Sequence, residues 1–91
     1  MSKSYTLEFN GSGVVAEGCF GSDIRALLWA ESVLENRGYD ANELTAGDWD
    51  ADGTNDDGEQ CYRMLFWARE ADAENDPGAN AICQLCKVGD N

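Results

Sequence analysis

The sequence predicts a small α+β domain, with an antiparallel sheet in the order β-β-α-β-β and one helix packed on one face. Three observations predict it: a strict alternation of apolar and polar residues near the start, one helical repeat of apolar residues, and two bulky apolar runs near the end. Its 91 residues are 43% hydrophobic, enough for one core but close to the lower size limit for one. We therefore expect a single domain over residues 1–91, with a long acidic loop at about 40–59.

The first predicted element is a hairpin. In "SYTLEF", residues 4–9, Tyr5, Leu7 and Phe9 alternate with polar side chains, which is typical of a half-buried strand. The glycine-rich "NGSG" that follows favours a tight turn, and "VVAEGCF" then predicts a second strand. Gly18 inside that strand indicates a bulge or the close approach of a neighbouring side chain.

The next twenty residues, "GSDIRALLWAESVLENRGYD", predict the helix. Ser22 or Asp23 is suited to cap its N-terminus, and Gly38 is a typical C-terminal stop. Trp29 is expected at the edge of the core. The stripe expected to face the sheet consists of Ile24, Leu27, Leu28 and Leu34, flanked by Ala30 and Val33.

The second half is organised around a long polar stretch. Residues 39–59 contain three glycines and no sustained apolar pattern, which predicts a loop of about twenty residues, longer than ordinary connections. "QCYRMLFWARE" favours a strand because it is rich in bulky and aromatic residues, although a helix is the alternative. Pro77 and Gly78 then predict a turn, and "AICQLCKV" a last strand.

Charge restricts the function more than any motif. Eighteen acidic residues against six basic ones give a net charge of −12, with eight acidic groups in residues 40–59 and four in 70–76. Such a chain is not expected to bind nucleic acid or anionic membranes directly, since both need Lys and Arg. Basic proteins and metal cations are the natural partners. Neither a membrane-length apolar run nor a secretory signal is seen, so we expect a cytoplasmic protein.

The cysteines are expected to be reduced and packed as small hydrophobic residues. They are Cys19, Cys61, Cys83 and Cys86. A zinc site is disfavoured because the sequence has one C-x-x-C and no histidine. In a strand, moreover, Cys83 and Cys86 point to opposite faces.

The stretch "DWDADGTNDDGE" matches the pattern of an EF-hand calcium loop, D-x-[DN]-x-[DN]-G-x5-E, at every specified position. The oxygen ligands would come from Asp48, Asp50, Asp52, Thr54, Asp56 and Glu59. The resemblance to the EF-hand family covers these twelve residues only. Asn55 stands where the family usually has an aliphatic residue, and the flanks do not predict the two helices of an EF-hand.

Catalysis is not expected. The chain has no histidine to act as a general base, and its carboxylates lie in predicted surface loops, where nothing raises a pKa. No cofactor is expected other than calcium, if residues 48–59 bind it.

In size, charge and predicted layout, most of the chain resembles small acidic phage-encoded inhibitors of bacterial defence, among them anti-CRISPR proteins that mimic DNA. The resemblance implies a non-catalytic protein, acting in the host cytoplasm, that occupies a basic, nucleic-acid-binding surface of another protein. The expected contacts are Asp48, Asp50, Asp52, Asp56, Asp57 and Glu59, with Asp72, Glu74 and Asp76 on a second acidic turn. A small calcium-binding module is the alternative, and the chain is either a monomer or a homodimer formed through a strand edge.

Overall fold

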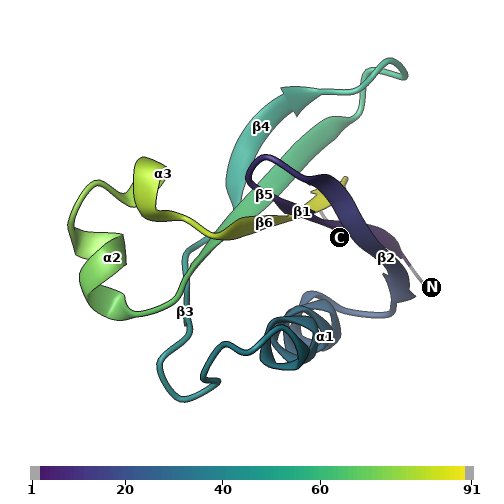
Figure 1. Cartoon of the computed structure of the whole chain (residues 1–91). Helices are drawn as coiled ribbons and strands as arrows, with labels where there is room; N and C mark the ends of the chain where they lie inside the picture. Colours follow the sequence, from purple (N-terminus) through teal and green to yellow (C-terminus); the bar gives the residue numbers. More distant parts are fainter. Residues whose placement is uncertain (1–2, 90–91) are drawn as a thin grey trace.

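The computed structural model describes residues 3–89, which form one six-stranded antiparallel sheet and three helices. The strands are β1 (Lys3–Phe9), β2 (Gly13–Phe20), β3 (Thr45–Ala46), β4 (Asp50–Thr54), β5 (Gln60–Trp67) and β6 (Cys83–Val88). The helices are α1 (Asp23–Asn36), α2 (Glu70–Glu74) and α3 (Pro77–Asn80). The sheet order is β2-β1-β6-β5-β3, with β4 also paired to β5, and α1 crosses one face (Figure 1). The predicted α+β class is confirmed.

The hairpin of β1 and β2 forms as the sequence predicts. Gly11 and Gly13 in the turn both have positive φ, at 82° and 71°, which explains the glycine-rich connection. The strand register shifts once, between Leu7 and Glu8. Gly18 is a point of close approach, because a Cβ there would lie 2.7 Å from the ring of Phe20.

Helix α1 has the predicted ends, but its buried face is only partly the predicted one. The Arg25 amide donates to Ser22 Oγ at 3.3 Å at the N-terminus, and Gly38 takes a φ of 100° just after the C-terminus. The fully buried residues are Ala26, Ala30 and Leu34, at i, i+4 and i+8.

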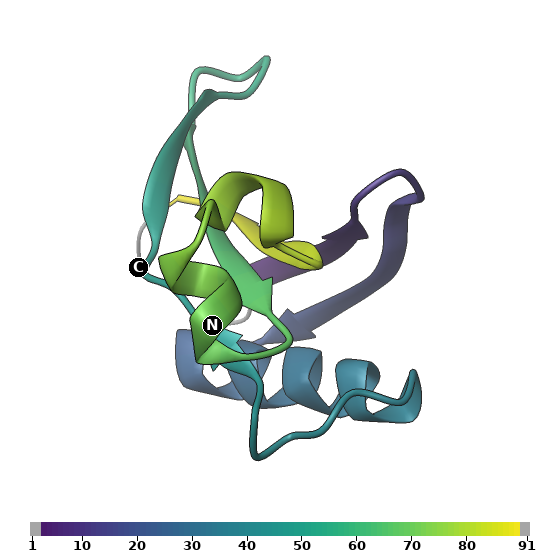
Figure 2. The same ribbon diagram turned by 60° about the vertical axis from the view of Figure 1, so that its left-hand side comes forward.

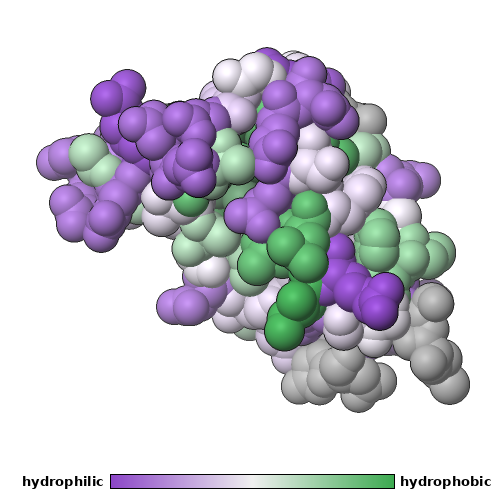
Figure 3. Space-filling model, turned by 90° about the horizontal axis from the view of Figure 1, so that it is seen from below, coloured by the Kyte–Doolittle hydropathy of each residue, from purple (hydrophilic) through white to green (hydrophobic). Residues whose placement is uncertain are grey.

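Within the predicted stripe, Ala30 and Leu34 are buried, and Leu27 and Val33 pack against the core. The prediction was wrong for Ile24 and Leu28, whose side chains are 71% and 60% exposed. Two alanines let the helix approach the sheet more closely than leucines would, and Ile24 and Leu28 then point outward. Apolar surface is accordingly visible on the side of the molecule where α1 lies (Figure 3).

The core lies between α1 and the central strands β1, β6 and β5. Its fully buried large side chains include Tyr5, Leu7, Leu34, Phe66 and Leu85. Trp29 lies at the core edge as predicted, with its ring 5.1 Å from that of Phe20.

Residues 40–59 are not one long loop. They contain the short strand β3 and the five-residue strand β4, both antiparallel to β5. All five residues of β4 are exposed. Sequence reasoning missed β4 because "DADGT" has no apolar alternation and only one β-branched residue, Thr54. Its hydrogen bonds to β5 hold it in the sheet.

The acidic stretch after β5 is not a simple turn. Residues 70–74 form α2, and Pro77 opens the four-residue α3. The Trp67 indole Nε1 donates to the carbonyl of Pro77 at 2.8 Å and ties this helical excursion to the end of β5. The predicted strands on either side of it, now β5 and β6, are confirmed.

Candidate functional site

Residues 48–59 contain β4 and the turn of the β4–β5 hairpin, which projects from the sheet on the side away from α1 (Figures 1 and 2). Its turn is organised by Asn55, whose side-chain oxygen accepts from the amides of Asp57 at 3.0 Å and Glu59 at 2.9 Å. Gly58 completes the turn with a φ of 81°. Asn55 breaks the EF-hand consensus, and in this hairpin its amide organises the turn.

The carboxylates of this hairpin are exposed and unbalanced. Asp48, Asp50, Asp52, Asp56, Asp57 and Glu59 are all solvent-exposed. The two salt bridges within residues 3–89, Lys87–Asp23 and Arg69–Asp72, involve none of them. Arg63 lies opposite Asp50 in the strand register, but its guanidinium Nη1 bonds to Gln84 Oε1 at 3.4 Å.

The hairpin differs from an EF-hand in the conformation of its calcium-pattern residues. Strands β3 and β5 stand before and after the twelve residues, where the family has its flanking helices, and β4 lies within them. Gly53 has its φ of 77° within an irregularity of the ladder between β4 and β5. Across residues 3–89, no group of three or more Cys, Asp or Glu side chains is placed to hold a metal ion. Calcium binding by this segment stays a prediction.

The second acidic segment lies at the other end of β5. Glu74 and Asp76 are exposed, whereas Asp72 is half-buried and pairs with Arg69 at 3.8 Å. β5 begins directly after the hairpin and ends just before α2, so about 20–25 Å separate the two segments. The predicted contact residues thus divide between two surfaces.

On the helix side of the sheet, one carboxylate is fully balanced. Asp23 accepts from Tyr5 Oη at 2.6 Å and from Lys87 Nζ at 2.7 Å, and Lys87 also lies 4.4 Å from the Trp49 ring centroid. Burial acts to raise the pKa of Asp23, but the hydrogen bonds from Lys87 and Tyr5 and the charges of Lys87 and Lys3 outweigh it, so this pKa lies below its ordinary value. The alternation Cys83, Leu85, Lys87 placed this lysine on the buried face, a signal that sequence reasoning passed over.

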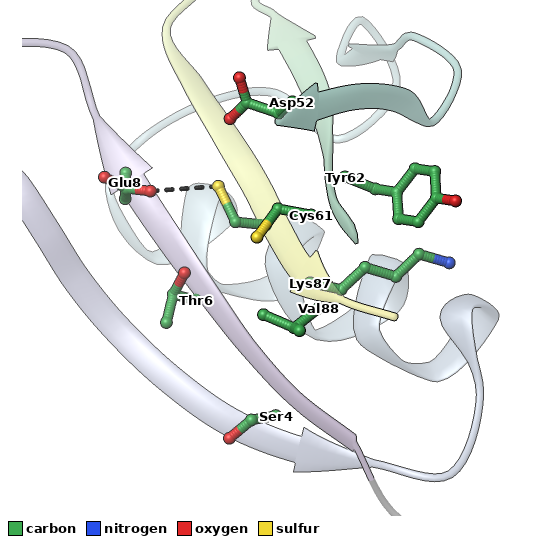
Figure 4. A pocket seen from close by; sticks show the side chains of 9 residues that line it. Ser4, Thr6, Glu8, Asp52, Cys61, Tyr62, Lys87 and Val88 are labelled. Carbon is green, nitrogen blue, oxygen red and sulfur yellow. Dashed lines mark hydrogen bonds between the residues drawn. The ribbon is translucent and has the colours of Figure 1, made fainter. Parts of the chain in front are cut away.

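The opposite face of the sheet carries a pocket of about 270 Å³, which we call the open-face pocket. Its lining residues are Ser4, Thr6, Glu8, Asp52, Cys61, Tyr62, Cys86, Lys87 and Val88 (Figure 4). Glu8 enters from β1 and Asp52 from β4. The sequence singled out Asp52 but not Glu8, because the pocket exists only once β1, β6, β5 and β4 lie side by side.

A thiol within the pocket responds to both carboxylates. The Cys86 thiol donates to Glu8 Oε2 at 3.1 Å. Burial, together with the hydrogen bond and negative charge of Glu8 and the charge of Asp52, raises the pKa of Cys86 to about 12, although a hydrogen bond with Thr6 opposes the shift. The protonated thiol is therefore the stable form, and Cys86 is poorly suited to act as a nucleophile.

The four cysteines occupy different environments. All are free: Cys83 is buried in the core, Cys61 and Cys86 are half-buried, and Cys19 is exposed. Cys83 and Cys86 point to opposite faces of β6, as predicted, and burial raises the pKa of Cys83 to about 12 despite the charge of Arg37. The expectation that the cysteines pack as small hydrophobic residues was wrong for Cys19, which lies on the edge strand β2.

Two findings complete the description of the chain. None of the helices in residues 3–89 has the length and apolar character needed to cross a membrane. Comparisons with protein-family models, curated proteins and solved structures give no significant match.

Proposed function

We propose that the protein is a non-catalytic binding protein whose β4–β5 hairpin occupies a basic, nucleic-acid-binding surface of a partner protein. The observation that supports this proposal is the projecting hairpin with six exposed carboxylates and no ion pair to any of them within residues 3–89. A partner that supplies lysines and arginines relieves their mutual repulsion. Negative potential also speeds association with such a partner.

The proposed target is a groove that otherwise holds nucleic acid. Such grooves are lined with Lys and Arg that neutralise phosphates, and a hairpin edge carrying carboxylates offers them a competing anionic surface. The predicted resemblance to phage-encoded DNA-mimic inhibitors, including anti-CRISPR proteins, suggests a bacterial defence complex as the partner. Inhibition would then follow from occupancy, with no chemical step.

The test uses proteins of a bacterial lysate that bind a DNA column. They are passed over the immobilised chain in low salt, and retained proteins are challenged with duplex DNA. We expect the wild-type chain to retain a protein that the duplex displaces and that a salt gradient elutes, because both ligands use the same cations.

Two variants with the same net charge locate the interaction. The hairpin variant replaces Asp48, Asp50, Asp56 and Asp57 with Asn. The control variant replaces Glu17, Glu31, Glu35 and Glu43 with Gln, outside the hairpin. Only the hairpin variant should lose the partner; equal loss in both variants, or a partner that DNA does not displace, would contradict the proposal.

Calcium binding by residues 48–59 is tested on the same material. A thermal melt with and without 1 mM calcium measures it, since a ligand that binds only the folded chain raises the melting temperature. A rise abolished in the hairpin variant, but not in the control variant, would favour the calcium-binding hypothesis.

A further inference from the structure

The open-face pocket is large enough to admit one long side chain. Its volume of about 270 Å³ lies below the range of roughly 300–1,000 Å³ that is typical of small-molecule sites. Val88 is an apolar part of the wall, whereas Ser4 and Thr6 offer hydroxyls that accept hydrogen bonds. An elongated side chain with a polar end fits this mixture.

Two carboxylates face this space from different strands. Glu8 is half-buried and already accepts from Cys86, with Gln84 Nε2 at 3.5 Å, so its position is fixed by its neighbours. Asp52 is exposed and stands on β4, across the pocket from β1 (Figure 4). Burial raises the pKa of the Cys86 thiol in the pocket wall, and the hydrogen bond and charge of Glu8 and then the charge of Asp52 act in the same direction.

Neither Lys87 nor Arg63, the cations on the two strands beside the pocket, forms a salt bridge with Glu8 or Asp52. Lys87 contributes to the pocket wall, but its ammonium is on the other side of the sheet, 2.7 Å from Asp23 Oδ2. Figure 4 shows Lys87 and Tyr62 extending away from Glu8. Arg63 is on the open face, where it bonds to the amide oxygen of Gln84, and it forms no salt bridge within 4.0 Å.

We propose that the open-face pocket is a socket for one basic side chain, preferentially arginine, of the partner protein. The socket lies beside the β4–β5 hairpin. That its occupant is a side chain of the partner protein rests on the proposed function. Arginine is preferred over lysine because guanidinium is more weakly hydrated than ammonium, and its planar fork of donors can bond a carboxylate such as that of Glu8 at two points.

The test titrates the ¹⁵N-labelled chain with butylguanidinium, followed by amide chemical shifts. Two further titrations serve as comparisons. Butylammonium shows whether the pocket prefers guanidinium to ammonium, and butanol shows whether a ligand without charge binds. We expect the shifts to be concentrated at Thr6, Glu8, Cys86 and Val88, with butylguanidinium binding more tightly than butylammonium and butanol giving no localised shifts.

The Glu8→Gln variant should weaken butylguanidinium binding about five- to tenfold, which is the effect of replacing a charge-assisted hydrogen bond with a neutral one. Gln retains an oxygen that accepts from Cys86, so the fold is expected to survive. Asp52→Asn, at an exposed position, is a second variant with the same expected direction. The matched control is Glu35→Gln on the exposed surface of α1, which should change the affinity by less than about twofold.

Three results would overturn the socket: shifts spread along the hairpin without localisation at the pocket, equal weakening in Glu8→Gln and Glu35→Gln, or the same localised shifts with butanol. The proposed function fails separately, through loss of the hairpin-dependent partner. A chain that keeps this partner but does not bind butylguanidinium in the pocket therefore refutes the socket alone.

Discussion

The carboxylates on the two faces of the sheet differ in their partners. On the helix side, Asp23 has a lysine and a tyrosine as donors and lies beside the core. On the open side, Glu8 has a thiol and an amide, and Asp52 has no salt bridge. The first arrangement satisfies its charge internally, whereas the second leaves charge for a ligand. If the open-face pocket is the socket that we propose, stability and binding belong to different sides of one sheet.

The largest loss of stability is expected from a variant that disrupts the packing between α1 and the sheet. Leu34 is fully buried beneath α1, so Leu34→Ala should cost about 3 kcal/mol in the free energy of unfolding through lost burial and a cavity. Leu28→Ala on the same helix is the matched control, because Leu28 is 60% exposed and should change stability by less than about 0.5 kcal/mol. Urea unfolding of both variants measures the difference, and similar losses would contradict the buried face described for α1.

The next effect comes from removing the helix-side cation. The Lys87 side chain is 6% exposed and that of Asp23 is 34% exposed, so Lys87→Met leaves a partly screened carboxylate without its ion pair. We expect a loss of about 2 kcal/mol, less than for a fully buried pair. Arg63→Met on the open face should cost less than about 0.5 kcal/mol.

A double variant identifies the cause. Adding Asp23→Asn to Lys87→Met removes the orphaned charge and should restore at least half of the lost stability in urea unfolding. No recovery would show that the aliphatic packing of Lys87, rather than its charge, is what the structure needs.

The sequence predicts some elements of the two faces better than others. Alternation in "SYTLEF" correctly placed Tyr5 and Leu7 in the core, and the cap residues located α1. The buried face of α1 was not predictable from hydrophobicity alone. The choice between Ala26 and Leu28 depends on how closely helix and sheet approach, which is a property of the packed pair.

The candidate site shows the same limit. Charge density alone located residues 48–59 as the acidic surface. A calcium-loop pattern and a bulged hairpin can, however, both require a glycine at the same place, here Gly53. Glu8 and Asp52 are 44 residues apart, and only the strand order places them around one pocket. Long-range pairing of this kind leaves no local signal in a single sequence.

Alkaline pH should weaken both faces. Burial, together with the hydrogen bond and charge of Asp23, raises the pKa of Tyr5, and burial raises the pKa of Cys83 and of Cys86 to about 12, so unfolding exposes groups that ionise more readily. Their contribution is complete below pH 9 and is lost as the pH rises from about 9 through 12. After allowance for partial exposure, we expect about 1 kcal/mol less stability at pH 10 than at pH 8.

The matched measurement is the same pH series on Cys86→Ala, which should show a smaller decline because one titrating thiol is absent. Urea unfolding between pH 7 and 10.5 under reducing conditions gives both curves. A stability that stays level up to pH 10.5 in the wild-type chain would contradict the protonated state described for these groups.

The smallest change in the free energy of unfolding is expected for variants on the open face, and its sign distinguishes a binding role from a structural one. Glu8→Gln keeps an acceptor for Cys86 and removes one of two like charges at the pocket, so the free energy of unfolding should stay within about 0.5 kcal/mol or rise slightly. Asp52→Asn should behave in the same way. A chain held together by these carboxylates would instead lose stability, as Lys87→Met does on the helix side. If urea unfolding shows Glu8→Gln to be as destabilising as Lys87→Met, Glu8 stabilises the fold. The proposed difference between a stabilising face and a binding face would then be contradicted.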